Sequence, residues 1–89
     1  HTISYIKRIT SQMKKAIIYV TTYCPYCHMA KEYLIKKGVV LEEKNVETDL
    51  KARDEMIQKS GQMGVPVLDI EGKIIVGFSQ EEIEKALEE

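Results

Sequence analysis

Apolar positions along the chain change period several times, and the changes mark the expected elements of secondary structure. The segment "AIIYV" (16–20) is a short apolar run rich in β-branched residues, and it predicts a buried strand. A helix is predicted next, because Pro25 suits a first helical position and Gly38 a C-terminal stop. The apolar stripe of this helix, which we expect to face the core, consists of Met29, Ala30, Tyr33 and Leu34.

The second half of the chain repeats this change of period. "VVLEEKNVE" (39–47) predicts a second strand, and Thr48 or Asp49 caps a second helix that runs to about Ser60. "PVLDI" (66–70) and "KIIVGF" (73–78) predict two strands joined by a tight turn at 71–72. Ser79 and Glu82 form a capping box at the start of a last helix. The apolar stripe of the last helix consists of Ile83, Ala86 and Leu87.

The order of these elements is βαβαββα, which predicts an α/β fold. A helix links the first two strands, so we expect them to be parallel, whereas the last two should form a hairpin. The result is a four-stranded mixed sheet flanked by three helices. At 89 residues the chain has room for one small domain.

The N-terminal residues differ from the rest. "HTISYIKRITSQ" (1–12) has no clear amphipathic role and precedes Met13 and two lysines, a pattern typical of a translation start. We therefore interpret residues 1–12 as an addition to the natural chain or a flexible extension, and residues 13–89 as the domain. The alternation in "TISYIKRI" leaves a short native strand as the alternative.

Composition and charge exclude several classes of partner. The formal net charge is −1 with the signs interspersed, so we expect no nucleic-acid partner. No apolar stretch approaches the ~20 residues that span a bilayer, and no signal peptide is recognised, so we expect no membrane partner and a cytoplasmic location.

Both cysteines of the chain lie within four residues, in "CPYC" at the start of the first predicted helix. A zinc site would need a second pair of ligands, and a haem attachment, which "CPYCH" fits, would need export and an axial His28. We expect neither, because the sequence has no second ligand cluster and no recognised export signal, and His28 should lie in solvent on the face opposite the apolar stripe. A structural disulfide would close a very short loop and stabilise little.

A redox couple accounts for the spacing of the pair. A sulfur at the N-cap faces unpaired backbone N–H groups and the positive end of the helix dipole, and both favour the thiolate. Cys24 is therefore the expected nucleophile, and Cys27 can resolve the mixed disulfide that forms. Pro25 stiffens the turn between them.

Three motifs together resemble the glutaredoxin family of the thioredoxin-like superfamily. They are "TTYCPYC" before a helix, "GQMGVP" some forty residues later and "VGFSQEE" before the last helix. The resemblance runs from about Met13 to the end of the chain and implies the same four-stranded fold. It also implies a glutathione-disulfide oxidoreductase that uses glutathione as reductant, with no metal, and acts on disulfide-bearing or glutathionylated proteins.

The resemblance further implies a set of ligand-binding residues. Pro66 would follow a cis peptide bond beside the cysteines, which would leave the backbone of Val65 to pair with an extended thiol substrate. The start of the last helix would bind the γ-glutamyl end of glutathione, and Gln62 would contact its glycyl carboxylate. The residues expected to bind glutathione are Tyr26, Gln62, Val65, Pro66, Gly77, Ser79 and Gln80.

The chain departs from the glutaredoxin pattern at three positions. Thr21 stands where many members have Lys, Gly64 replaces the usual Thr, and Phe78 replaces the second Gly of a Gly-Gly pair. Gly77 with Phe78 resembles the redoxins that serve ribonucleotide reductase, so recharging by thioredoxin reductase is an alternative. A second alternative is a non-catalytic iron–sulfur cluster carrier, against which Pro25 counts.

Overall fold

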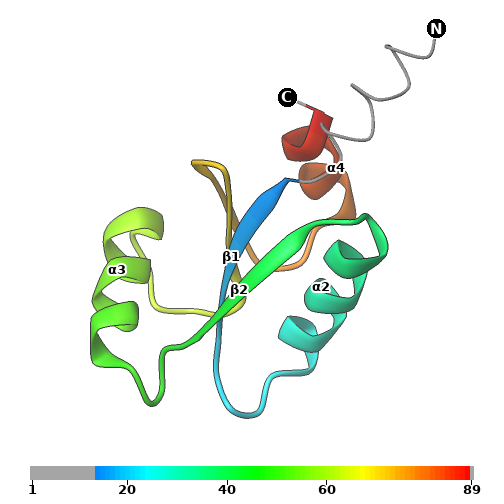
Figure 1. The fold of residues 1–89 in the computed structure, drawn as a ribbon. Coiled ribbons are helices and arrows are strands. Elements are labelled where there is room, and N and C mark those ends of the chain that lie inside the picture. Colours follow the sequence, from blue (N-terminus) through cyan, green and yellow to red (C-terminus); the bar gives the residue numbers. More distant parts are fainter. Residues whose placement is uncertain (1–13, 89) are drawn as a thin grey trace, which may run out of the picture.

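Four strands and three helices follow one another in the predicted order over residues 14–88, the part of the chain that this computed structural model describes (Figure 1). The elements are β1 (Lys15–Val20), α2 (Pro25–Lys36), β2 (Val40–Asn45), α3 (Leu50–Ser60), β3 (Val67–Ile70), β4 (Lys73–Val76) and α4 (Gln80–Glu88). The expected start of the domain at residue 13 lies outside the described residues. Over the described range, no helix combines the length and apolarity that crossing a membrane requires.

The strands form one mixed sheet in the order β2-β1-β3-β4. β1 is parallel to β2 and antiparallel to β3, and β3 and β4 form an antiparallel hairpin, as predicted. β1 therefore lies in the interior of the sheet, and its C-terminal end leads into the loop before α2. This places the start of α2, with both cysteines, at one end of the sheet.

Alternate residues of β1 face two separate layers of the core. Ile18 and Val20 pack with Ala30 and Leu34 of α2 and with Ile83 of α4. Tyr19 points to the other face and packs with residues of α3. Figure 1 shows α2 and α4 on one side of the sheet and α3 on the other.

The apolar stripe of α2 differs from the prediction at Met29. The residues of α2 that are buried are Cys27, Ala30 and Leu34, at spacings of three and four. Met29 precedes Ala30 and is therefore rotated about 100° away from the stripe, so that it is 47% exposed. The expectation that Met29 faces the core is wrong.

Two strands end earlier than predicted, for local reasons. β2 ends at Asn45, whose side-chain Oδ1 accepts a hydrogen bond from the N–H of Glu47 at 2.8 Å and closes a turn. β4 ends at Val76 because Gly77 has a φ of 85°, in the left-handed region that glycine favours.

A cluster of charged side chains surrounds the hydroxyl of Tyr19 on the α3 side of the sheet. The hydroxyl donates to Glu55 Oε2 and accepts from Lys59 Nζ at 2.8 Å. Lys59 also donates to Asp69 Oδ2 at 2.6 Å, and Lys44 Nζ lies 3.0 Å from Glu55 Oε2. The hydrogen bonds from Tyr19 and then Lys44 lower the pKa of Glu55 to about 2. Burial, followed by the hydrogen bond to Glu55, raises the pKa of Tyr19.

Candidate active site at the Cys24–Cys27 pair

Cys24 occupies the N-cap of α2 in extended backbone geometry, with φ −154° and ψ 95°. Its Sγ accepts a hydrogen bond from the N–H of Cys27 at 3.1 Å, and Pro25 begins the helix without an N–H to satisfy. The two cysteines are joined by a disulfide with their Cα atoms 5.2 Å apart. The predicted positions of both sulfurs at the helix N-terminus are therefore confirmed.

The two cysteines differ in their access to solvent. Cys24 is partly exposed, whereas Cys27 is only 3% exposed and belongs to the core cluster under α2. The first turn of α2 contains no acidic residue that would oppose a negative charge on sulfur. An incoming sulfur can thus approach Cys24, while Cys27 is reached only from within the protein.

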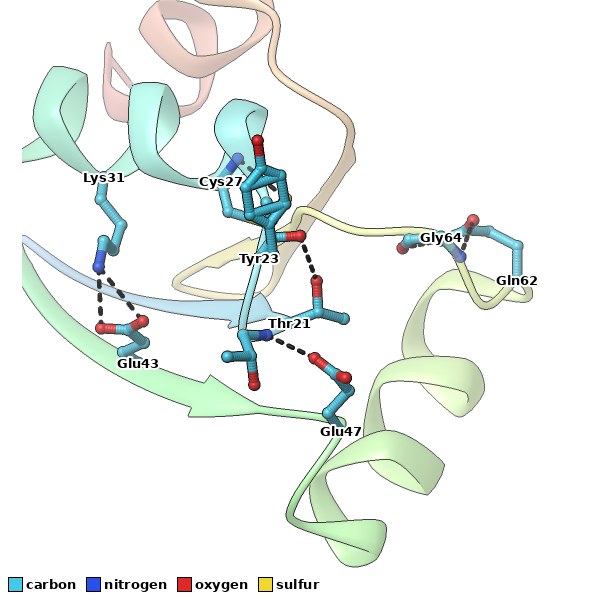
Figure 2. The surroundings of a disulfide bond; sticks show 10 residues. Thr21, Tyr23, Cys27, Lys31, Glu43, Glu47, Gln62 and Gly64 are labelled. Atoms are coloured by element: carbon cyan, nitrogen blue, oxygen red, sulfur yellow. Dashed lines mark hydrogen bonds and ion pairs between the residues drawn. A yellow bond between two sulfur atoms is a disulfide. The ribbon is translucent and has the colours of Figure 1, made fainter.

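Hydrogen bonds from the end of β2 and the loop after it fix the loop that precedes Cys24 (Figure 2). Glu47 Oε1 accepts a hydrogen bond from the N–H of Thr22 at 2.6 Å. Asn45 Nδ2 lies 3.3 Å from Thr22 Oγ1, and Thr21 Oγ1 donates to the carbonyl of Tyr23 at 3.3 Å. The contact of Glu47 was not predicted, because its sequence neighbourhood is typical of a strand, where the side chain would have no loop to hold.

The loop before β3 contains the cis peptide bond between Val65 and Pro66 that the family resemblance implies. Pro66 is buried, and its carbonyl accepts a hydrogen bond from the N–H of Gly77 at 2.8 Å. Val65 packs against the same core cluster as Cys24 and Phe78. The backbone hydrogen bonds of the described loops include none at Val65.

Gln62 turns its side-chain amide back onto its own loop (Figure 2). Gln62 Oε1 accepts from the N–H of Gly64 at 2.7 Å, and Gln62 Nε2 donates to the Gly64 carbonyl at 3.1 Å. We call this pair of hydrogen bonds the Gln62–Gly64 clasp. A Cβ atom at position 64 would lie 2.8 Å from Gln62 Oε1, so the clasp in this form requires glycine.

Ser79 caps the last helix, as the capping box predicts. Its Oγ accepts from the N–H of Glu82 at 3.3 Å, and its carbonyl accepts from the N–H of Ile83 at 3.0 Å. Gln80 is exposed at the first position of α4. The ring of the preceding Phe78 meets the ring of Tyr33 edge-on, with centroids 5.9 Å apart.

Several side chains near the cysteines are exposed. Tyr23 is 83% exposed and Tyr26, between the two cysteines, is 65% exposed. His28 is exposed, as expected, and lies 3.0 Å from Glu32 Oε2 one turn along α2. Residues 14–88 contain no group of three or more His, Cys, Asp or Glu side chains arranged to hold a metal ion.

The structure thus places the predicted residues in three segments around one end of the sheet. The start of α2 carries the cysteines and Tyr26, the loop before β3 carries Val65 and Pro66, and the start of α4 carries Ser79 and Gln80. The Gly77–Pro66 hydrogen bond ties the last two segments together. Gln62 belongs to the second segment, but its amide is engaged in the clasp.

Comparison with known proteins gives consistent matches in sequence. The family model described as Glutaredoxin matches residues 16–75. A glutaredoxin-like 8.6 kDa protein, uncharacterised and encoded in a rubredoxin operon of Clostridium pasteurianum, is 49% identical over 71 residues, which are 80% of this chain and 95% of that protein. Glutaredoxin 3 of Escherichia coli K12 is 40% identical over 65 residues, which are 73% of this chain and 78% of that protein.

Solved structures agree with the sequence matches. The crystal structure of a variant of a thioredoxin-like protein superposes with a TM-score of 0.77 at 32% identity. The alignment covers 85% of this chain and 97% of that one. The mixed four-stranded sheet with three helices is therefore the thioredoxin-like arrangement.

Proposed function

This chain belongs to the glutaredoxin family, and from that membership we propose that it is a glutathione-dependent thiol–disulfide oxidoreductase. Its substrates would be protein disulfides and glutathione mixed disulfides. The observation that carries the proposal is the disulfide at the start of α2, between a partly exposed Cys24 and a buried Cys27. A cytoplasmic location is part of the proposal, because glutathione keeps the cytosol reducing.

The reaction begins with both cysteines reduced. The Cys24 thiolate attacks one sulfur of the substrate disulfide, a mixed disulfide forms, and the other substrate sulfur leaves as a thiolate that takes up a proton. Cys27 loses its proton and attacks Cys24 Sγ, which closes the Cys24–Cys27 disulfide and releases the substrate cysteine. Two electrons thus pass to the substrate, and two molecules of glutathione return the enzyme to its dithiol form.

The helix N-terminus supports the first step through charge. The N–H of Cys27 already points at Cys24 Sγ, and the dipole of α2 stabilises a negative charge at this end. The Glu47–Thr22 hydrogen bond supports the same step through position, because it fixes the loop that carries Cys24.

Glutathione would lie across the three segments of the site. The backbone of Val65 would pair with its cysteinyl residue as a strand does, beside Pro66. The N–H groups at the start of α4, in the segment that contains Gly77, Ser79 and Gln80, would bind the γ-glutamyl carboxylate, and Tyr26 would flank the ligand. Gln62 would reach the glycyl carboxylate only after the Gln62–Gly64 clasp opens.

A second candidate keeps the chemistry and changes the electron donor. The engagement of Gln62 with Gly64 and the presence of Phe78 in place of glycine both favour a redoxin that thioredoxin reductase recharges. An iron–sulfur carrier has no specific observation in its favour.

The test is a pair of coupled assays on one disulfide substrate. One assay supplies glutathione with glutathione reductase, and the other supplies thioredoxin reductase alone. Glutathione dependence predicts turnover in the first assay only, and turnover in the second alone assigns the redoxin function. Cys24→Ser should abolish activity in either assay, whereas Cys27→Ser should keep some removal of glutathione from mixed disulfides and lose reduction of protein disulfides. Equal residual activity in the two variants contradicts the roles assigned to the cysteines.

A further inference from the structure

A shallow groove of about 480 Å³ lies between α2 and the start of α4. Its apolar lining comes from Met29, Tyr33 and Ile35 of α2 and from Phe78. The hydroxyl of Tyr33 donates to Glu84 of α4, and its ring lies edge-on to the ring of Phe78. Glu32 and Lys36 also line the groove, with opposite charges. We call this feature the α2–α4 groove.

The α2–α4 groove meets the candidate active site at Gln80, which belongs to both. Tyr26, Met29 and Tyr33 follow one another on α2 at spacings of three and four, which places them on one face of the helix. Tyr26 and Met29 are 65% and 47% exposed. An apolar strip therefore leads along α2 from the end where Cys24 lies into the groove.

The distance along α2 limits what can fill the groove while bonded to Cys24. With a rise of 1.5 Å per residue, Met29 lies about 7.5 Å and Tyr33 about 13.5 Å along the helix axis from Cys24. An extended chain advances about 3.3 Å per residue, so the middle of the groove lies about three residues from a cysteine bonded to Cys24. Glutathione has one residue on each side of its cysteine, so in the proposed pose it would touch the groove only at Gln80 and at the near edge by Met29.

These observations indicate which disulfide substrates the protein would prefer. The inference rests on the proposed function. We propose that the α2–α4 groove binds an uncharged apolar side chain of a disulfide-bearing polypeptide, about three residues from the cysteine that exchanges with Cys24. The lining favours an apolar side chain because Met29, Tyr33, Ile35 and Phe78 supply most of its surface. The balanced charges of Glu32 and Lys36 give no preference for an acidic or a basic one.

The experiment compares synthetic disulfide-linked peptides that differ in one residue. Each peptide has Leu or Ser three residues before or after the reactive cysteine, and pre-reduced full-length protein reduces it in a single turnover. This format needs no external electron donor, so it does not depend on how the enzyme is recharged. At sub-saturating peptide we expect the Leu peptide of one polarity to react about tenfold faster than its Ser counterpart.

Two variants test whether the groove is the source of this preference. Met29→Glu places a charge in the groove and should bring the Leu-to-Ser rate ratio close to one. Leu50→Glu, at a residue of α3 that is 66% exposed, is the matched control and should keep the ratio of the unmodified protein. The ratio is internal to each variant, so it is independent of the overall reactivity of Cys24.

Different experimental results would overturn the inference and the proposed function. Equal rates for Leu and Ser peptides in both polarities overturn the inference while leaving disulfide reduction intact. A ratio that Met29→Glu leaves unchanged also overturns it. A protein that reduces neither the peptides nor a small disulfide such as bis(2-hydroxyethyl) disulfide overturns the proposed function, and the inference with it.

Discussion

Replacing Tyr19 by Phe removes one hydroxyl from the centre of the charged cluster under α3 and leaves the ring in place. Tyr19 is fully buried in the middle of the sheet, between β2 and β3. Its hydroxyl joins Glu55 and Lys59, which lie one turn apart on α3. Tyr19→Phe therefore tests whether this cluster holds α3, and the loop that follows it, against the sheet.

The size of the expected effect follows from what remains after the substitution. A hydrogen bond to a charged group contributes about 1.5–3 kcal/mol, and Tyr19→Phe removes two of them. Lys59 keeps Asp69 at 2.6 Å, and Glu55 keeps Lys44 at 3.0 Å, so neither charge is left without a partner. We therefore expect a total loss of about 1.5–3 kcal/mol rather than twice that amount. For a domain of this size the Tm should fall by at least about 6 °C.

The loss of stability in Tyr19→Phe should also depend on pH, and the titration of Glu55 determines whether the loss grows or shrinks as the pH falls. The folded-state pKa of Glu55 is lowered to about 2 from an ordinary value of 4.5, and the hydrogen bond from Tyr19 is the largest cause. A lowered carboxylate pKa contributes stability that is present above the unfolded-state pKa and is lost as the pH falls through the folded-state pKa. The difference between the two proteins should therefore be full above pH 4.5 and shrink between pH 4.5 and 2.

Tyr33→Phe provides a matched control, because the Tyr33 hydroxyl also donates to a glutamate, Glu84. That hydrogen bond lies at the surface, where water can replace it, so its loss should change stability much less. The assay is urea unfolding followed by circular dichroism, at neutral pH and at about pH 3, where Glu55 is still ionised in the fold but protonated when unfolded. Equal losses in the two variants, or a Tyr19→Phe loss that does not shrink in acid, would refute the role assigned to the cluster.

Three further substitutions test the loops around Cys24 and the scaffold. Gly64→Ala should open the Gln62–Gly64 clasp, because the new Cβ would lie 2.8 Å from Gln62 Oε1. The freed Gln62 amide should lower the KM for a glutathione mixed disulfide, whereas Gln62→Ala should not, and a double variant that keeps the lowered KM would contradict a role for the amide. Glu47→Ala removes the acceptor for the Thr22 N–H and should lower the single-turnover rate of disulfide reduction roughly tenfold. An unchanged rate would show that Glu47 does not position the loop. Asp49→Ala removes the N-cap of α3 and should cost about 1 kcal/mol in urea unfolding, and a loss below about 0.5 kcal/mol would argue against that cap.

The fold was predictable because hydrophobic spacing and capping residues agree along most of the chain. The β-branched run of β1 and the cap at Asp49 identify their elements without help from distant residues. Met29 shows the limit of this reasoning. Helical spacing identifies several neighbouring faces of an amphipathic helix, and only the placement of α2 on the sheet decides that Ala30 is buried and Met29 is not.

The cysteines were predictable for a similar reason, since their chemistry depends on local structure at one helix N-terminus. The residues that support them were not, because they come from other loops. Glu47 is 25 positions from Thr22, and nothing in the local pattern relates the two. The charged cluster around Tyr19, on the other face of the sheet, was partly predictable, because a buried Tyr needs a polar partner for its hydroxyl.

Two departures from the glutaredoxin pattern gain a common physical meaning from the structure. Gly64 leaves the space that the Gln62 amide fills, so a group able to bind a small carboxylate is engaged within the protein. Phe78 adds a ring beside Tyr33 and extends the apolar lining of the α2–α4 groove. Under the proposed function, both changes would weaken polar contacts to a tripeptide and strengthen apolar contacts to a longer chain. Neither changes the position of Cys24 at the helix N-terminus. On this proposal, selectivity among disulfides would change while the exchange chemistry at Cys24 stays the same.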